Sequence, residues 1–153
     1  KQKLFDVIFE ENLTRFYRSF IEILSAPLDL ESKISNLISA EIDMQLENRD
    51  LPLFIISEAS RNPEMMVEKM THLPVKQFVM QFSHVIHEEI NKGNIKPINP
   101  IHILMHIMSL CIFPFVGRPV FTAITGTTSE QFNLLMEDRK KIITESVIQL
   151  FKK

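Results

Sequence analysis

The sequence predicts an all-α protein, and three observations lead to this prediction. The 153 residues include only 3 Gly against 12 Phe and 8 Met, which indicates few tight turns and a core of long, adaptable side chains. Apolar residues recur along most of the chain at the i, i+3, i+4, i+7 spacing of amphipathic helices, and no segment alternates like a strand. The length suits one core and no linker is visible, so we expect a single domain spanning residues 1–153.

The first two predicted helices are bounded by a proline and a capping residue. The first runs from Lys3 to Leu24 and ends before Pro27. The second starts after Asp29, whose side chain can cap it, and ends near Asn48. One face of the second helix is apolar: Ile34, Leu37, Ile38, Ile42 and Leu46.

Prolines divide the middle of the chain into three further helices. Asp50, with Pro52 just inside, starts the helix LPLFIISEASR, because a first-turn proline loses no needed hydrogen bond. Asn62-Pro63 ends it, and a short helix over 64–70 follows. A long helix then ends at Gly93, a typical left-handed terminator, and residues 94–99 form a loop. The apolar positions of this long helix are Phe78, Phe82, Val85, Ile86 and Ile90.

The last third of the chain contains the most apolar segment, PIHILMHIMSLCIFPFVG, which starts at Pro100. Pro114, Pro119 and a turn at 126–128 separate this segment from a last helix over 129–151. The apolar side of the last helix carries Phe132, Leu135, Met136, Ile142, Ile143, Val147 and Leu150. The uncharged run 101–116 spans about 24 Å as a helix, short of a hydrocarbon core of about 30 Å, so we expect no membrane span.

A helix that is apolar on nearly every side needs cover on every side. We expect one face to pack within the chain and the opposite face to pair with a second copy; the inward face carries Leu104, Met105, Met108 and Ile112. The two last long helices would then form a four-helix dimer interface. The predicted interface residues are Ile103, Ile107, Leu110, Leu134, Ile148 and Phe151. The alternative is a monomer in which both helices are central.

Charge and cysteine content exclude several classes of partner. Basic and acidic residues number 17 and 19 and are spread along the chain, which gives no footprint for nucleic acid or anionic lipid. The single Cys111 allows no internal disulfide, and no export segment is visible, so we expect a cytoplasmic protein.

Three segments carry a recognisable pattern: KQKLFDVIFEEN, NRDLPLFIISEASRNPEMM and HEEINKGNIKPINPIHIL. Their order and spacing resemble the C-terminal part of bacterial TetR-type (TetR/AcrR) transcriptional repressors. KQKLFDVIFEEN at the start is similar to the beginning of the family's fourth helix, which directly follows the DNA-binding helix-turn-helix. NRDLPLFIISEASRNPEMM, residues 48–66, resembles the sixth-helix region. HEEINKGNIKPINPIHIL, from His87, is similar to the junction that leads into the eighth helix. Lys3 departs from the acidic residue that is usual at its position.

The resemblance implies a TetR-like C-terminal helical bundle that binds an effector and dimerises. It implies that a helix-turn-helix domain precedes Lys1 and binds operator DNA as a dimer with recognition helices about 34 Å apart. Lys1 matches a lysine that reaches a DNA phosphate in the family. The implied partners are a second copy of the chain, a largely apolar small-molecule effector and operator DNA. We expect no membrane partner.

An effector pocket in a helical domain should be mostly apolar with a few polar groups. We expect nine residues to line it: Phe54, Glu58, Met65, Met66, Phe78, Phe82, Met105, His106 and Phe113. The Phe and Met side chains suit ordinary core packing equally well. For Glu58 we favour exposure to solvent or a pair with Arg61 over a contact with a polar ligand.

Enzyme chemistry finds little support in the sequence. His102 and His106 have the i, i+4 spacing of some zinc ligands, but no third ligand accompanies them, and we expect no metal and no cofactor. Cys111 lies roughly 140° around the helix from His106, so we expect an inert thiol. A stand-alone helical interaction module and a metal-dependent helical enzyme remain the alternatives.

Overall fold

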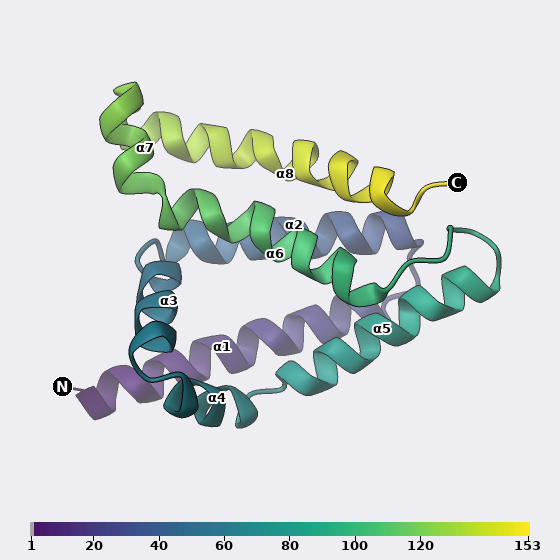
Figure 1. Ribbon diagram of the computed structural model, residues 1–153, viewed down its shortest axis with the longest axis horizontal. Helices are drawn as coiled ribbons and strands as arrows, with labels where there is room; N and C mark the ends of the chain where they lie inside the picture. The colour runs from purple at the N-terminus through teal and green to yellow at the C-terminus, as the bar shows by residue number, and fades with distance from the viewer. Residues whose placement is uncertain (1) are drawn as a thin grey trace.

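The computed structural model describes residues 2–153, and their side chains from Asp6 onward except that of Ile8. Within these residues the chain forms eight α-helices and no strand, which confirms the all-α prediction (Figure 1). The helices are α1 Gln2–Ser25, α2 Leu30–Glu47, α3 Leu51–Arg61, α4 Pro63–Thr71, α5 Val75–Asn91, α6 Pro100–Val116, α7 Arg118–Thr125 and α8 Ser129–Phe151.

Short-range chemistry explains most of the helix ends. The Asp29 carboxylate accepts a 2.7 Å hydrogen bond from the amide of Ser32 and caps α2, as predicted. Gly93 follows α5 with a φ of 74°, a left-handed conformation that glycine adopts without strain. Thr128 and Gln131 exchange hydrogen bonds in a capping box at the start of α8.

Two prolines act differently from the prediction. Pro114 lies inside α6, which continues to Val116, so this proline does not help to separate the apolar segment from the last helix. Pro119 stands in the first turn of α7, where its missing amide hydrogen is not needed, and it therefore starts a helix that the sequence analysis did not separate.

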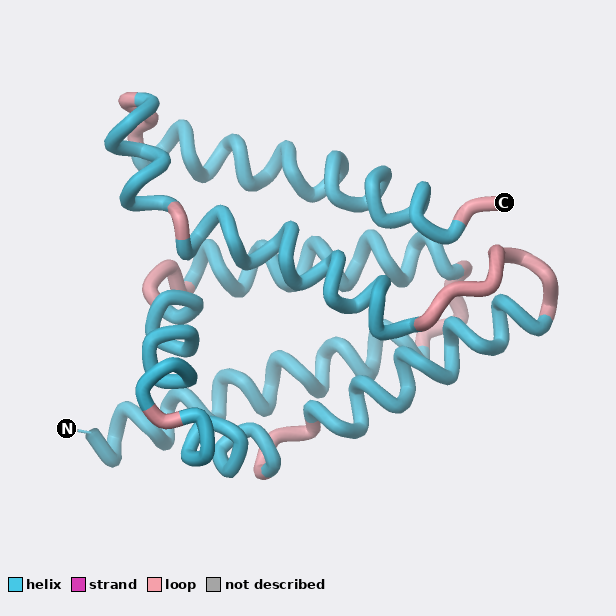
Figure 2. The backbone as a smooth tube through the Cα atoms, viewed as in Figure 1, coloured by secondary structure: helices cyan, strands magenta, loops and turns pink. Residues whose placement is uncertain are grey.

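The helices are arranged around α2. This helix packs against α1, α6 and α8, and α5 covers α1 and α6. In Figure 1, α8 and α6 lie above α1 and α5, and α3 and α4 close the end of the bundle near the N-terminus. Figure 2 shows that the connections at this end are short, whereas a longer loop joins α5 to α6 at the opposite end.

The main core is built on the apolar stripe of α2, where Ile34, Ile38 and Ile42 have no exposed surface. Phenylalanines bridge α1 and α5 beside it, with the rings of Phe20 and Phe78 5.1 Å apart. A second, smaller cluster of Phe9, Leu13 and Leu73 lies where α1 meets the end of α4. The domain therefore contains one large core and one small satellite core.

The predicted orientation of α6 is wrong. Ile103 and Ile107 are 0% and 5% exposed and belong to the main core of their own chain, whereas Met105 and Met108 on the other side are 60% and 42% exposed. α6 contacts α2, α3, α5 and α8, so the side that these helices cover carries Ile103 and Ile107.

Three further residues of the predicted dimer face also pack within the chain. Phe151 is buried, and its carbonyl accepts a 3.0 Å hydrogen bond from the amide of Lys96. Leu110 and Ile148 are half-buried against the main core. Of the six predicted interface residues, Leu134 alone is mostly exposed, because the chain's own helices cover the others fully or in part.

No helix in the described part of the chain is both long and apolar enough to cross a membrane by itself. The pair α6 and α7 reaches the required length and composition only when combined, and the two helices are bent by 60°.

Truncation of Ile38 should destabilise the fold strongly. We expect Ile38→Ala to lower the free energy of unfolding by about 2 to 5 kcal/mol, because it leaves a cavity in the most enclosed part of the core. The control Ile56→Ala removes the same atoms from an exposed side chain of α3 and should cost about 1 kcal/mol or less. Chemical denaturation measures both, and equal losses would contradict the central position of α2.

Candidate functional site

A cavity of about 410 Å³ opens where α1 passes the turn between α2 and α3. This volume lies within the usual range for small-molecule sites, about 300 to 1,000 Å³. Three segments of the chain line it, through Phe9, Asn12, Glu47, Asn48, Arg49, Asp50, Leu51 and Phe54. Separate elements of the chain therefore line the cavity, which a single helix could not form.

One wall of this cavity is aromatic. The rings of Phe9 on α1 and Phe54 on α3 meet edge to face, with centroids 5.8 Å apart. Leu13 and Leu73 lie in the same satellite core and are almost fully buried. An apolar ligand in the cavity would thus rest on the satellite core.

Residues on α7 and α8 form polar contacts with the rim of the cavity. The Arg49 Nη2 donates a 2.9 Å hydrogen bond to Asn133 Oδ1 on α8. The Arg118 guanidinium at the start of α7 lies 3.8 Å from Asp50 Oδ1 and 5.9 Å from the ring centroid of Phe132. The turn between α2 and α3 is therefore linked directly to α7 and α8.

A neighbouring groove of about 370 Å³ continues from the cavity between α1 and α2. The two hollows share Asn12, Glu47 and Asn48. The groove is more polar than the cavity and extends past Arg15 and Asp43. Together they form one elongated hollow along α1.

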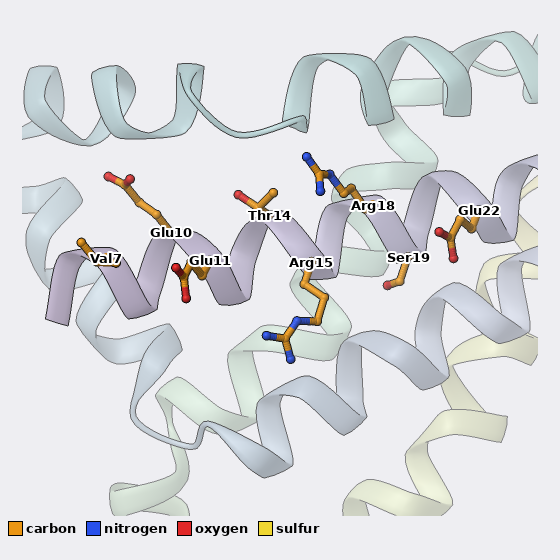
Figure 3. A pocket seen from close by; sticks show the side chains of 8 residues that line it. All are labelled: Val7, Glu10, Glu11, Thr14, Arg15, Arg18, Ser19 and Glu22. Carbon is orange, nitrogen blue, oxygen red and sulfur yellow. The ribbon is translucent and has the colours of Figure 1, made fainter. Parts of the chain in front are cut away.

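A larger hollow, of about 700 Å³, lies on α1 alone. Figure 3 shows its eight side chains, which all come from this helix and mix acids such as Glu10 and Glu22 with Arg15 and Arg18. A single helix cannot enclose a ligand, so we place the candidate site at the smaller cavity.

The structure does not bring the nine predicted ligand residues together. Phe54 lines the cavity, and Glu58 pairs with Arg61 at 3.8 Å, one of the two roles that we favoured. Met66, Phe78 and Phe82 are buried packing residues, and Met65 and His106 are half-buried. Met105 and Phe113 are 60% and 71% exposed, so the prediction that they line an interior pocket is wrong. Lys1, the predicted DNA contact, lies outside the described residues.

Two buried polar residues were missed by the sequence analysis. Glu41 and Gln45 on α2 are only 6% and 3% exposed. A signal was available, because both continue the helical stripe of Ile34, Ile38 and Ile42.

Burial perturbs three titratable groups around this position. It raises the pKa of Glu41 to about 7, although the hydrogen bond from Gln45 partly opposes the shift. Burial, and then the charge of Glu41, raise the pKa of Tyr17 to about 12. The same two causes raise the pKa of the Cys111 thiol, and Arg139 opposes them weakly.

The described residues include no group of three or more His, Cys, Asp or Glu side chains placed to hold a metal ion. Of the histidine pair on α6, His102 is exposed and His106 is half-buried.

The structure is thus an all-helical bundle with a cavity of small-molecule size where α1 meets the turn between α2 and α3. Residues 31–147 match the model of the family described as Tetracyclin repressor-like, C-terminal domain, and the chain belongs to this family. Such domains are typically the ligand-binding regulatory domains of TetR repressors and are generally not enzymes. The match confirms the resemblance seen in the sequence. No curated protein matches the chain.

The Cys111 thiol should be unreactive in the folded domain. It is 1% exposed and its pKa is raised, so little thiolate forms and reagents do not reach it. We expect a disulfide reagent to modify it at least about a hundredfold more slowly in buffer than in denaturant. Similar rates in both solutions would show that the core around α6 opens readily.

Proposed function

We propose that residues 1–153 form the effector-binding and dimerisation domain of a ligand-responsive transcriptional repressor in the cytoplasm. A helix-turn-helix domain joined to it would bind operator DNA, and a small molecule bound in the helical domain would release that DNA. Membership of the tetracyclin repressor-like family carries this proposal, and the cavity at α1, α2 and α3 supports it. Neither catalysis nor a cofactor is part of it.

The position of the cavity suggests how the signal travels. α1 forms one side of the cavity, and the sequence resemblance makes α1 the helix that follows the DNA-binding domain. Near its start, Asp6 Oδ1 accepts a 2.9 Å hydrogen bond from Lys69 Nζ on α4. A ligand that pushes against Phe9 and Phe54 would move α1 relative to α3 and α4. A coupling of about 1 to 3 kcal/mol is typical between two such sites.

The effector itself should be largely apolar with one or two polar groups. Phe9, Leu51 and Phe54 offer apolar contacts, whereas Asn12 and Arg49 offer hydrogen bonds at the rim. A ligand that contacts the apolar side chains and also forms hydrogen bonds with the rim would be held in one orientation.

A second copy of the chain is the proposed cover for the exposed apolar surface of α6, α7 and α8. Most large hydrophobic side chains that are exposed in the described part of the chain lie on these three helices. They are Ile101, Met105, Met108, Phe113, Val120, Phe121, Ile124, Leu134, Leu135 and Ile142. Monomeric proteins rarely leave so many apolar side chains uncovered on neighbouring helices. The interface would therefore use the outer side of α6, with Leu134 of α8 retained from the sequence prediction.

A charge on this surface should dissociate the dimer. Leu134 is 67% exposed, so Leu134→Glu should leave the fold intact but shift a micromolar sample from dimer to monomer, because a carboxylate would be desolvated in the interface. Sedimentation velocity measures the mass. Val67→Glu on α4, where the side chain is 63% exposed, is the matched control and should stay dimeric. A monomeric unmodified chain would overturn the dimer.

Ligand binding should depend on Phe54. We expect a screen of small apolar molecules by thermal shift to yield binders, and Phe54→Ala to weaken them about tenfold or more through loss of an aromatic wall. Leu53→Ala, on the outward side of the same helix, should leave the affinity unchanged.

The same binders tested on the full-length repressor should lower its affinity for operator DNA. Binders that occupy the domain yet leave DNA affinity unchanged would refute the regulatory proposal while preserving the ligand site.

A further inference from the structure

Glu41 and Gln45 form a polar pair inside the main core. They stand one turn apart on α2, and Gln45 Nε2 donates a 2.7 Å hydrogen bond to Glu41 Oε1. Both residues are more than nine-tenths buried among helices that are otherwise apolar at this level. A polar pair in such a place has to satisfy its hydrogen bonds internally.

No described residue forms an ion pair with Glu41. The titratable groups that face it are Tyr17 on α1 and Cys111 on α6, and neither is a cation. Arg139 on α8 is a cation that acts on Cys111, but it forms no ion pair with Glu41: its Nη2 donates to the Leu110 carbonyl at 3.1 Å, and its buried Nε has no hydrogen-bond partner among the described residues. A carboxylate at this position would be a buried charge without a partner, which is strongly unfavourable.

The unpaired amide oxygen of Gln45 also favours a proton on Glu41. Gln45 Oε1 is buried and accepts no hydrogen bond from any described residue. An ionised carboxylate only accepts hydrogen bonds, whereas a neutral carboxylic acid also has an O–H to donate. If the amide is turned over, its oxygen faces Glu41 Oε1 at 2.7 Å, and that contact needs the proton as well. A neutral acid can supply the donor that Gln45 Oε1 lacks in the first orientation and the proton that the 2.7 Å contact needs in the second, whereas an ionised carboxylate can supply neither.

We propose that Glu41 is a neutral carboxylic acid in the folded domain, that its O–H donates to Gln45 Oε1 in an acid–amide pair, and that losing this proton weakens the junction of α1, α2 and α6. The domain thereby contains a proton-sensitive element at its centre. This inference does not depend on the identity of an effector.

The direction of the pH effect follows from the two states of Glu41. Its pKa is about 7 in the fold, against an ordinary value of 4.5 in the unfolded chain. The folded state therefore holds the proton more tightly, and the resulting stability is fully present below pH 4.5 and lost as the pH rises to about 7. Tyr17 and Cys111 titrate above this window, because their pKa values are raised.

The first test compares melting temperatures of the unmodified chain and Glu41→Gln between about pH 5 and about pH 9. Glutamine keeps the shape and the paired hydrogen bonds but has no proton to lose. We expect the variant to melt several degrees higher than the unmodified chain above neutral pH, with the gap shrinking towards acid pH. The control Glu58→Gln replaces a half-exposed glutamate, and its melting temperature should change with pH in the same way as that of the unmodified chain. A gap that does not vary with pH, or a less stable variant at alkaline pH, would overturn the proposal.

A second measurement detects the proton directly and does not need the variant to be stable. Carboxyl carbons of the unmodified chain are labelled with ¹³C at glutamate and titrated by NMR. One glutamate should titrate near pH 7, well above the ordinary glutamate range. If every glutamate of the folded domain titrates in the ordinary range, Glu41 is ionised at neutral pH and the acid–amide pair does not exist.

Discussion

The enclosure of α2 is the constraint on which the rest of this structure depends. Ile34, Ile38 and Ile42 have no exposed surface, and α1, α6 and α8 are the helices that cover them. A stripe that faces three neighbours fixes the distance and rotation of each neighbour, because interiors pack at nearly crystalline density. The direction of α1 and the inner side of α6 both follow from this packing.

The two cores give the domain a rigid part and an adaptable part. The main core spans α1, α2, α5, α6 and α8, whereas the satellite core of Phe9, Leu13 and Leu73 is small and borders an open cavity. Local opening is cheapest where few apolar contacts are lost. The cavity therefore lies beside the part of the domain with the fewest buried apolar contacts. The acid–amide pair is the polar exception within the rigid part, so its protonation acts on the packing of α2 itself.

Little of the candidate site followed from the sequence. Phe54 is the only predicted ligand residue that lines the cavity. Its partner Phe9 stands 45 positions earlier, and their contact arises only when α3 folds back across α1. The polar rim also depends on distant pairs, such as Arg49 with Asn133. Such contacts leave no local signal, because periodicity relates residues of one helix and says nothing about which helix lies opposite.

The sequence by itself determined the bounds of most helices, with α7 as the exception, and the family to which the chain belongs. Caps, first-turn prolines and the left-handed Gly93 act within a few residues, so local chemistry suffices to place them. Only the tertiary structure decided which side of α6 faces inward. A helix that is apolar all round gives equal support to both orientations, and the choice of Ile103 and Ile107 over Met105 depends on the shape that α2, α5 and α8 present.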